Sequence, residues 1–344
     1  MTARSDLLQR PKPATIKTIA LELGLAISTV SRALQDDPIV RPQTRARVNE
    51  AADRLGYKRD FRGVNLRTGK TFTLCALLAS NPSPEFGDPA TMHLIQGLIE
   101  GVSDSDFKVV IRPVEGFEDQ LGACREAVID GRFDGFILDH TEPQDLRIAY
   151  LLERRIPFIT FGRTDFCRDH AYFDIDNEDA AYVATRHLAA KGHDRIALID
   201  SPSQFLFTSH RLEGYRRALT EAGFPYDPAL VVEMPITVRS VSDRVARLMN
   251  SPGAPTGFVT ANEVATIGTI SAMRMLAPTG LDRFDFVSRD GTTLFDFLQP
   301  PVSSCYFPIL EAGRQLAQGL VRAVRGVPVS EIQTVKSTQL VERT

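Results

Sequence analysis

The sequence predicts a small all-α domain at the N-terminus, followed by an α/β body with two lobes. The first observation is charge: residues 1–71 hold 14 lysines and arginines against 7 aspartates and glutamates, while the rest of the 344-residue chain is acidic. The second is pattern, because short apolar runs alternate with longer amphipathic segments beyond residue 71. Such alternation is typical of parallel sheets wound by right-handed crossovers. A basic head on an acidic body indicates a nucleic-acid-binding domain joined to a second domain.

The head contains the stretch "TIKTIALELGLAISTVSRALQ" at residues 15–35. Thr15 can cap a first helix, and Gly24 can end it. A second helix, over residues 27–34, follows after a very short turn, and a third begins near Pro42. Two short helices joined in this way, with a third that closes a small apolar core, predict a helix-turn-helix domain.

The second helix presents side chains that suit a DNA major groove. Arg32 can donate two hydrogen bonds to a guanine edge, Ser28 can bond a base or a phosphate, and Ile27 can contact a thymine methyl group. The hydroxyl groups of Thr29 and Ser31 are placed to bond phosphate oxygens. The predicted DNA-binding residues of this domain are Thr15, Ile27, Ser28, Thr29, Ser31 and Arg32. The alternative is an ordinary helical hairpin without a role in DNA binding.

The body is expected to hold two similar lobes, because it has too many predicted strands for one ordinary sheet. Strands are predicted at residues 72–79, 107–113, 133–140, 156–162, 195–200, 256–261 and 284–288. Helices are predicted around residues 91–104, 118–130, 144–154, 178–191, 209–222, 240–250 and 263–276. Ligands in such folds bind at the carboxyl ends of the strands, so a cleft between the lobes is the expected binding site.

We find no catalytic or metal-binding motif in the body. Gly-x-Ser-x-Gly, His-Glu-x-x-His and Gly-x-Gly-x-x-Gly do not occur, and the six histidines do not cluster at ligand spacing. We therefore expect neither an enzyme, nor a metal site, nor a cofactor. The four scattered cysteines suit buried thiols in a reducing compartment. Because the sequence shows neither a membrane-spanning apolar run nor a secretory signal, we expect a cytoplasmic protein without membrane contact.

The stretch at residues 15–35, followed by "TRARVNEAADRLGY" at residues 44–57, resembles the DNA-binding domain of the LacI/GalR family of bacterial transcription regulators. The resemblance extends along nearly the whole chain: "DIDNEDAAYVATRHLAAKGHDRIALI" is similar to the segment that opens the second lobe of the family's periplasmic-binding-protein-like body. The implied fold is an N-terminal helix-turn-helix domain plus a body of two doubly wound parallel-sheet lobes. One departure is Ala26, where the family has a serine that caps the second helix.

The resemblance also implies the domain boundaries. Residues 1–13 are expected to form a flexible extension, 14–58 the helix-turn-helix domain, 59–71 a hinge, and 72–344 the effector-binding and dimerisation domain. Within the effector-binding and dimerisation domain, the N-lobe is expected to comprise residues 72–174 and 306–328. The C-lobe is expected to comprise residues 175–304 and 329–344.

The hinge segment "FRGVNLRTGKT", residues 61–71, looks at first like a phosphate-binding loop. The gap between its glycines is one residue too long, and an expected strand follows it where a nucleotide site needs a helix. The resemblance instead implies a short helix that forms on DNA. Its Leu66 enters the minor groove, and Arg62, Arg67 and Lys70 contact phosphates.

The segments "SHRLEGYRRAL", "TANEVA" and "FVSRDGT" carry the family's effector-site pattern. The resemblance implies that Arg211, Asn262 and Asp290 bind the effector. An arginine fork, an amide and a carboxylate beyond strand ends can together satisfy a polyhydroxyl ligand. Further candidates are Arg163 and, as an aromatic wall, Phe86, Phe207 and Phe307. Arg289, where the family has phenylalanine, favours an acidic or phosphorylated effector as an alternative to a carbohydrate.

Together these features predict a homodimeric repressor of carbohydrate-utilisation genes. It would bind a pseudo-palindromic double-stranded operator and respond to a small-molecule effector, a sugar or sugar derivative, in the interlobe cleft. The alternatives are a solute-binding protein for sugar uptake, a regulator with a non-sugar effector, and a sugar-handling enzyme with a DNA-binding head. The basic helix-turn-helix argues against a solute-binding protein, and no catalytic pair was found for an enzyme.

Overall fold

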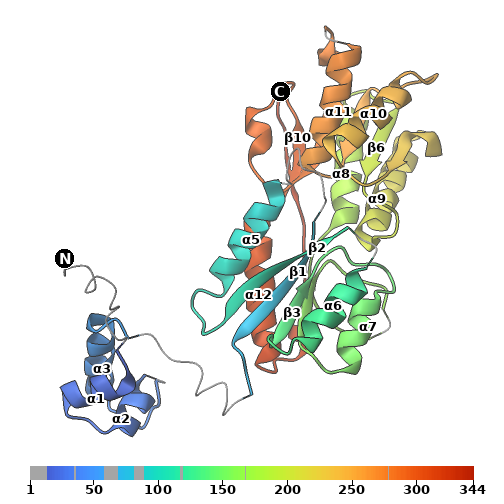
Figure 1. Ribbon diagram of the computed structural model, residues 1–344. Coiled ribbons are helices and arrows are strands. Elements are labelled where there is room, and N and C mark those ends of the chain that lie inside the picture. The colour runs from blue at the N-terminus through green and yellow to red at the C-terminus, as the bar shows by residue number, and fades with distance from the viewer. Residues whose placement is uncertain are drawn as a thin grey trace, which may run out of the picture. The chain divides into compact units, whose positions relative to one another are not determined.

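The computed structural model describes residues 14–34, 36–57, 69–80, 89–116, 119–166, 168–277 and 279–344. The chain divides into two units, Met1–Lys70 and Thr71–Thr344, and Figure 1 labels most of their helices and several of their strands. Four predicted site residues lie outside the described residues: Arg62, Leu66, Arg67 and Phe86.

The first unit is a helix-turn-helix, as predicted. Its elements are α1 (Ile16–Leu23), α2 (Ile27–Ala33) and α3 (Pro42–Arg54). Thr15 caps α1 in a reciprocal capping box with Thr18, and Gly24 ends the helix in the left-handed conformation that glycine adopts at little cost. The core is a small cluster that includes Ile19, Val30 and Val48. Ala26 precedes α2 without a side-chain hydrogen bond, as its methyl group requires.

The second unit begins with a parallel sheet in the order β11-β5-β4-β3-β1-β2. Its strands are β1 (Thr73–Ser80), β2 (Lys108–Glu115), β3 (Gly135–Leu138), β4 (Phe158–Phe161), β5 (Ala171–Ile175) and β11 (Gln333–Lys336). Alternate residues of β1 enter two different cores, which explains why that strand is continuously apolar. One face carries α5 (Pro89–Gly101) and α12 (Ile309–Val324), and the other α6 (Gln120–Ile129) and α7 (Leu146–Glu153). This is the N lobe.

The C lobe is built around a sheet in the order β12-β10-β9-β8-β6-β7, in which only β12 is antiparallel to its neighbour. Its strands are β6 (Ile196–Asp200), β7 (Val231–Glu233), β8 (Gly257–Thr260), β9 (Asp285–Asp290), β10 (Ser303–Tyr306) and β12 (Gln339–Val341). Helices α8 (Asn177–Ala190) and α9 (Leu206–Ala222) cover one face, and α10 (Val238–Met249) and α11 (Glu263–Leu276) the other. Short 3-10 turns lie at Pro228–Leu230, Leu281–Arg283, Leu294–Phe297 and Val329–Glu331.

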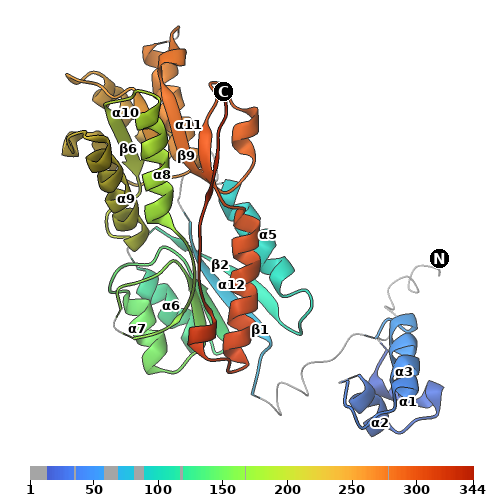
Figure 2. The same ribbon diagram turned by 180° about the vertical axis from the view of Figure 1, so that it is seen from behind.

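Within the described residues the chain passes between the two sheets after β5, after β10 and after β11. Figure 2 shows the last passage, where the dark red C-terminal segment runs from one lobe to the other. We predicted that residues 329–344 lie wholly in the C-lobe, and this is wrong. Strand β11 pairs with β5 in the N-lobe sheet, because Ile332 is buried in the N-lobe core.

The predicted strands and helices of the body are all present, but several elements were not anticipated. They are α12 and the short strands β5, β7, β10, β11 and β12. The cysteines at positions 75, 124 and 305 are buried free thiols, and Cys167 lies outside the described residues. Among the described helices, none has the length and apolar character needed to cross a lipid bilayer.

Candidate functional site

A cavity of about 140 Å³ lies between the two lobes, with room for roughly five water molecules or a small polar ligand. Its walls come from the carboxyl ends of strands in both sheets. The N lobe contributes Asp139, His140, Phe161, Gly162, Asp174 and Ile175, and helix α5 adds Ala90, Thr91 and Leu94. The C lobe contributes Asn177, Ser201, Phe207, Arg211, Ala261, Asn262 and Arg289, and α12 adds Ile309. This is the position expected for a ligand in a doubly wound fold.

Arg211 on α9 is the most constrained polar group of the cavity. It is 7% exposed and donates to both carboxylate oxygens of Asp200, at the end of β6. It also donates to Oδ1 of Asn177 at 2.9 Å. A guanidinium has five N–H groups, and these contacts use three, so two remain for a ligand. Asp200 and Asn177 thus orient the fork that the cavity presents.

An aromatic wall stands beside this fork. The guanidinium of Arg211 lies 4.7 Å from the ring centre of Phe207, which is a cation–π distance. Phe207 stacks on Phe205 at 5.2 Å, and His140 meets both rings edge-on at 5.8 and 5.2 Å. Because His140 belongs to the N lobe and both phenylalanines to the C lobe, the wall is assembled from the two lobes together.

Carboxylates of the N lobe and cationic groups of the C lobe line the same cavity. Asp139 accepts a hydrogen bond from the backbone amide of Ala79 at 3.0 Å. Asp174 accepts one from Nε of Arg163 at 2.7 Å, and burial raises the pKa of the Asp174 carboxyl, an effect that Arg163 opposes. Arg211 and Arg289 line the same cavity from the C lobe. The site therefore offers both hydrogen-bond acceptors and donors to a ligand.

Asn262 lies at the start of α11, where its Oδ1 accepts a hydrogen bond from the amide of Ala265 at 2.9 Å. With the oxygen engaged as a helix cap, the NH2 group is what the side chain can present to the cavity. Of the predicted effector residues, the structure thus brings together Arg211, Asn262 and Phe207.

The structure places three other predicted effector residues outside the cavity wall. Arg163 acts behind Asp174, to which it is paired. Phe307 is half-buried and packs its ring against Phe173, at the edge of the N-lobe core, with ring centres 5.8 Å apart. Asp290 is fully buried inside the C lobe, where it accepts hydrogen bonds from the amide of Thr292 and the hydroxyl of Ser304. Burial, and then the nearby Glu263, raise the pKa of Asp290 to about 7.

Several lining residues were missed in the sequence, chiefly Asp139, His140, Asp174, Asn177 and Ser201. The sequence does hold a signal for Asp139 and His140, because both directly follow a short apolar strand. Polar residues at the carboxyl end of a parallel strand are positioned for a ligand.

The helix-turn-helix presents a separate candidate surface on α2. Ile27 is 51% exposed, and Ser28 and Arg32 are also exposed, whereas Val30 and Ala33 are buried. Nε of Arg32 lies 4.0 Å from a carboxylate oxygen of Asp37, which is a weak surface ion pair. Thr29 and Ser31 are half-buried, and Thr15 is exposed at the start of α1. An exposed isoleucine beside an arginine is the arrangement that a major groove can accommodate.

Two family models match the chain. Residues 15–60 match "Bacterial regulatory proteins, lacI family", and residues 185–344 match "Periplasmic binding protein-like domain". The transcriptional regulator AglR of Rhizobium meliloti is 30% identical over 322 residues, covering 91% of this chain and 88% of the relative. The regulator RafR of Escherichia coli is 29% identical over 321 residues, covering 93% and 94%.

Solved structures agree with these relatives. A complex of the transcriptional regulator CelR with cellobiose superposes with a TM-score of 0.72 at 26% identity, covering 97% of this chain and 99% of that one. A LacI-family regulatory protein from Chloroflexus aggregans gives a TM-score of 0.69 at 25% identity, covering 80% and 98%. A DNA-reading head on a two-lobed body with a ligand cavity is the architecture of a ligand-responsive transcriptional regulator. The chain belongs to the LacI family of bacterial regulatory proteins.

Proposed function

We propose that this regulator represses carbohydrate-utilisation genes, and that a sugar or sugar derivative in the interlobe cavity controls its affinity for an operator. The observation that carries the proposal is the joint construction of the cavity, which the Arg211 fork and the Phe207 ring line together with Asp139 and Asp174 of the other lobe. Sugar hydroxyl groups donate to carboxylates and accept from guanidinium N–H groups, while an apolar ring face packs on an aromatic wall. The cellobiose complex of CelR supports a carbohydrate effector.

Control follows from the two-lobed construction. A ligand that contacts residues of both lobes at once binds the closed arrangement better than the open one. It can therefore shift the population by its difference in affinity, and by no more than that. We propose that residues 59–71 act as the hinge that transmits this change to the DNA-binding head. The proposed effector contacts are Arg211, Asn262 and Phe207, and the proposed DNA contacts of the head are Thr15, Ile27, Ser28, Thr29, Ser31 and Arg32.

We also propose that the protein acts as a cytoplasmic homodimer on a pseudo-palindromic operator, and that it has no catalytic role. Support for a dimer comes from large apolar side chains that face solvent in both lobes. On α5 they are Met92, 67% exposed, and Ile99, 55% exposed, and on α11 Met275 is 65% exposed. A twofold dimer would bury such side chains on itself and present two heads to two half-sites.

A thermal-shift screen tests the effector assignment. The probes are cellobiose, other mono- and disaccharides, sugar acids and sugar phosphates, because a ligand that binds only the native state raises Tm by mass action. We expect a neutral sugar to raise Tm, and Phe207→Leu to weaken that shift by removing the ring from the wall. Phe297→Leu, at a phenylalanine that is 81% exposed, is the matched control and should leave the shift unchanged.

A shift given only by sugar phosphates or sugar acids would replace the neutral sugar by an anionic effector, for which Arg289 is the matching residue in the cavity. An identical shift in wild type and Phe207→Leu would show that the ligand binds elsewhere.

A further inference from the structure

The segment that follows β3 has an unusual backbone. Asp139 and His140 line the cavity, and His140 has a φ of 49°, in the left-handed region that few residues other than glycine occupy. Such a strained conformation persists only when neighbouring residues hold the backbone in place.

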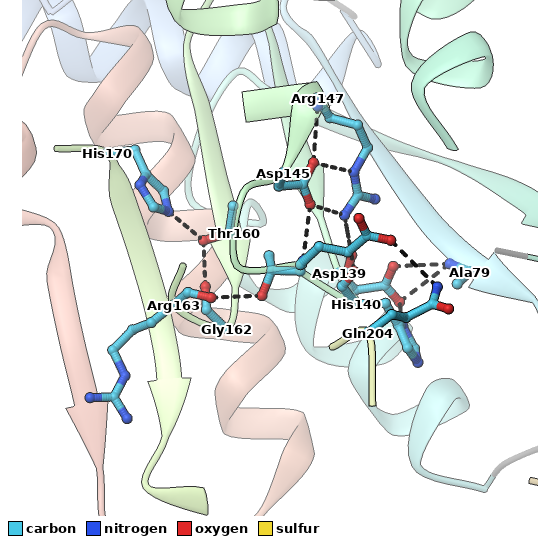
Figure 3. Close-up of polar contacts among 12 residues, drawn as sticks. Ala79, Asp139, His140, Asp145, Arg147, Thr160, Gly162, Arg163, His170 and Gln204 are labelled. Atoms are coloured by element: carbon cyan, nitrogen blue, oxygen red, sulfur yellow. Dashed lines mark hydrogen bonds and ion pairs between the residues drawn. The ribbon is translucent and has the colours of Figure 1, made fainter. Parts of the chain in front are cut away.

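A buried ion pair on α7 holds this segment. Arg147 is 4% exposed and Asp145 is 2% exposed. Nε and Nη2 of Arg147 bind the two carboxylate oxygens of Asp145 at 3.0 and 2.7 Å. As Figure 3 shows, Nη2 also donates to the backbone carbonyls of Asp139 and His140, at 2.9 and 3.1 Å, so one of its two N–H groups is shared between two acceptors. Hydrogen bonds from a charged donor are stronger than neutral ones, so the guanidinium clamps both peptide groups.

The clamped segment reaches the other lobe. The carbonyl oxygen of Thr141 accepts a hydrogen bond from the backbone amide of Leu206 at 3.0 Å. Beside it, Nε2 of Gln204 donates to Oε1 of Glu142 at 3.4 Å, a contact that Figure 3 includes. Thr141 is itself fixed, because its hydroxyl donates to the carbonyl of Arg163 at 2.8 Å.

The backbone amide of Leu206 needs a hydrogen-bond acceptor from outside its own helix. Leu206 is the first residue of α9, and an amide at that position has no acceptor within its own helix. The residue at the N-cap is Phe205, whose side chain cannot accept a hydrogen bond. The N lobe therefore supplies through Thr141 a cap for the helix that carries Phe207 and Arg211.

We propose that Arg147 is a positioning residue of the effector site: it holds residues 139–142 so that the Thr141 carbonyl caps α9 across the lobe interface. Lobe closure and the order of the effector-binding helix are then one event, since separating the lobes uncaps the helix. The link to the effector rests on the proposed function, whereas the contact across the lobes does not.

Hydrogen exchange at single-residue resolution tests this in the full-length protein without any added ligand. The main variant is Asp145→Asn/Arg147→Met. It avoids a lone buried charge, and it keeps a good cap for α7 because asparagine caps as well as aspartate. We expect the amide of Leu206 to exchange at least about tenfold faster than in wild type, since a hydrogen bond held by charge-assisted contacts is lost. Amides further along α9, such as that of Ala218, should keep their rates.

Arg154→Met is the matched control, because Arg154 follows α7 and makes an exposed ion pair with Glu153. It should leave the exchange of Leu206 unchanged. Arg147→Met alone is the second variant and should accelerate Leu206 in the same way.

An unchanged rate at Leu206 in both Arg147 variants would overturn the proposal. So would an acceleration that is equal at Leu206 and at Ala197 inside β6, because that pattern reports general loosening of the lobe. If no sugar in the thermal-shift screen binds, the proposed function is wrong, but the exchange result at Leu206 still holds.

Discussion

Arg211, a proposed effector contact, also supports stability, because its partner Asp200 is fully buried at the end of β6. Removing one member of a buried ion pair leaves the other charge without compensation, which costs about 3–5 kcal/mol. We therefore expect Arg211→Met to lower the free energy of unfolding by about that amount, measured by denaturant titration. Loss of effector binding in this variant cannot then be separated from loss of folding.

The double variant Asp200→Asn/Arg211→Met should recover most of the stability, because it removes both charges together. A single variant as stable as wild type would show that Asp200 is solvated and that the pair does not support the fold. Phe207 remains the better residue for probing the ligand alone.

The raised pKa of the Asp290 carboxyl predicts that the stability of the protein depends on pH. Burial in the C lobe and the neighbouring Glu263 raise its pKa from 3.8 to about 7 in the folded state. Arg343 lies 4.0 Å from its Oδ2, while Asp296 and Tyr306 are the other titratable groups nearby. The folded state binds the proton more tightly than the unfolded chain. This group's contribution to stability is therefore fully present below about pH 4 and is lost as the pH rises through about 7.

We expect Asp290→Asn, which stays neutral, to have a higher Tm than wild type at pH 8, by about 2–4 °C for each kcal/mol recovered. The difference should shrink at pH 5, where wild type is protonated. Asp282→Asn, at an exposed aspartate of the same lobe, is the control. Equal pH profiles for Asp290→Asn and wild type would contradict the assignment.

At the scale of elements, α5 and α12 pack so closely that glycine is required between them. A Cβ atom at Gly97 would lie 2.0 Å from the carbonyl oxygen of Leu310 and 3.0 Å from Cα of Gly313. These are backbone atoms, so the helices would have to separate. Both helices also line the cavity, through Leu94 and Ile309.

We expect Gly97→Ala to destabilise the protein by about 1–3 kcal/mol, because an added methyl group overpacks the contact. Helix propensity alone predicts the opposite sign, a gain of about 1 kcal/mol, so the measured direction decides between the two effects. Thermal unfolding measures it, with Gln96→Ala on the exposed side of α5 as the control. A higher Tm for Gly97→Ala would mean that the two helices are not held at this distance.

Local sequence patterns predict structure best at the scale of helices and strands. Most long amphipathic helices and continuously apolar strands were predicted because each carries many residues of one pattern, although the 16-residue helix α12 was missed. Strands β7, β11 and β12 have three or four residues each, too few for any period to be recognised. Their existence depends on the neighbouring strand that pairs with them.

At the scale of the whole molecule, specific binding to DNA is the decisive property. Arg32 is exposed on α2, where a guanidinium can bond a guanine edge. With a DNA site selected by the wild-type protein from a random pool, we expect Arg32→Ala to lose about 1–3 kcal/mol of discrimination at one base pair. Fluorescence anisotropy against the selected site and its single-base variants measures this.

Arg47→Ala removes the same charge from the exposed side of α3 and is the control. It should weaken binding to all sequences alike and leave base preference intact. For wild type, affinity should fall linearly with salt on logarithmic axes, because phosphate contacts release counterions. Equal loss of preference in both variants would remove Arg32 from base recognition.

The sequence by itself determined the order of the domains, the helix-turn-helix and most elements of the two lobes. These depend on caps, apolar periodicity and charge, which act over a few residues. Motif resemblance also led to Arg211 in the second turn of α9 and to Asn262 at the N-cap of α11, and both helices follow a strand.

Only the tertiary structure decided which polar side chains share the cavity. Asp290 and Phe307 carry the same local signals as the lining residues, yet the packing of the lobes turns Asp290 into the C-lobe interior and Phe307 against the N-lobe core. Asp139 and His140 enter the site because two sheets meet there, and Thr141 reaches α9 because the lobes touch. Contacts between residues so far apart in the chain arise from how the lobes pack, and no local pattern encodes them.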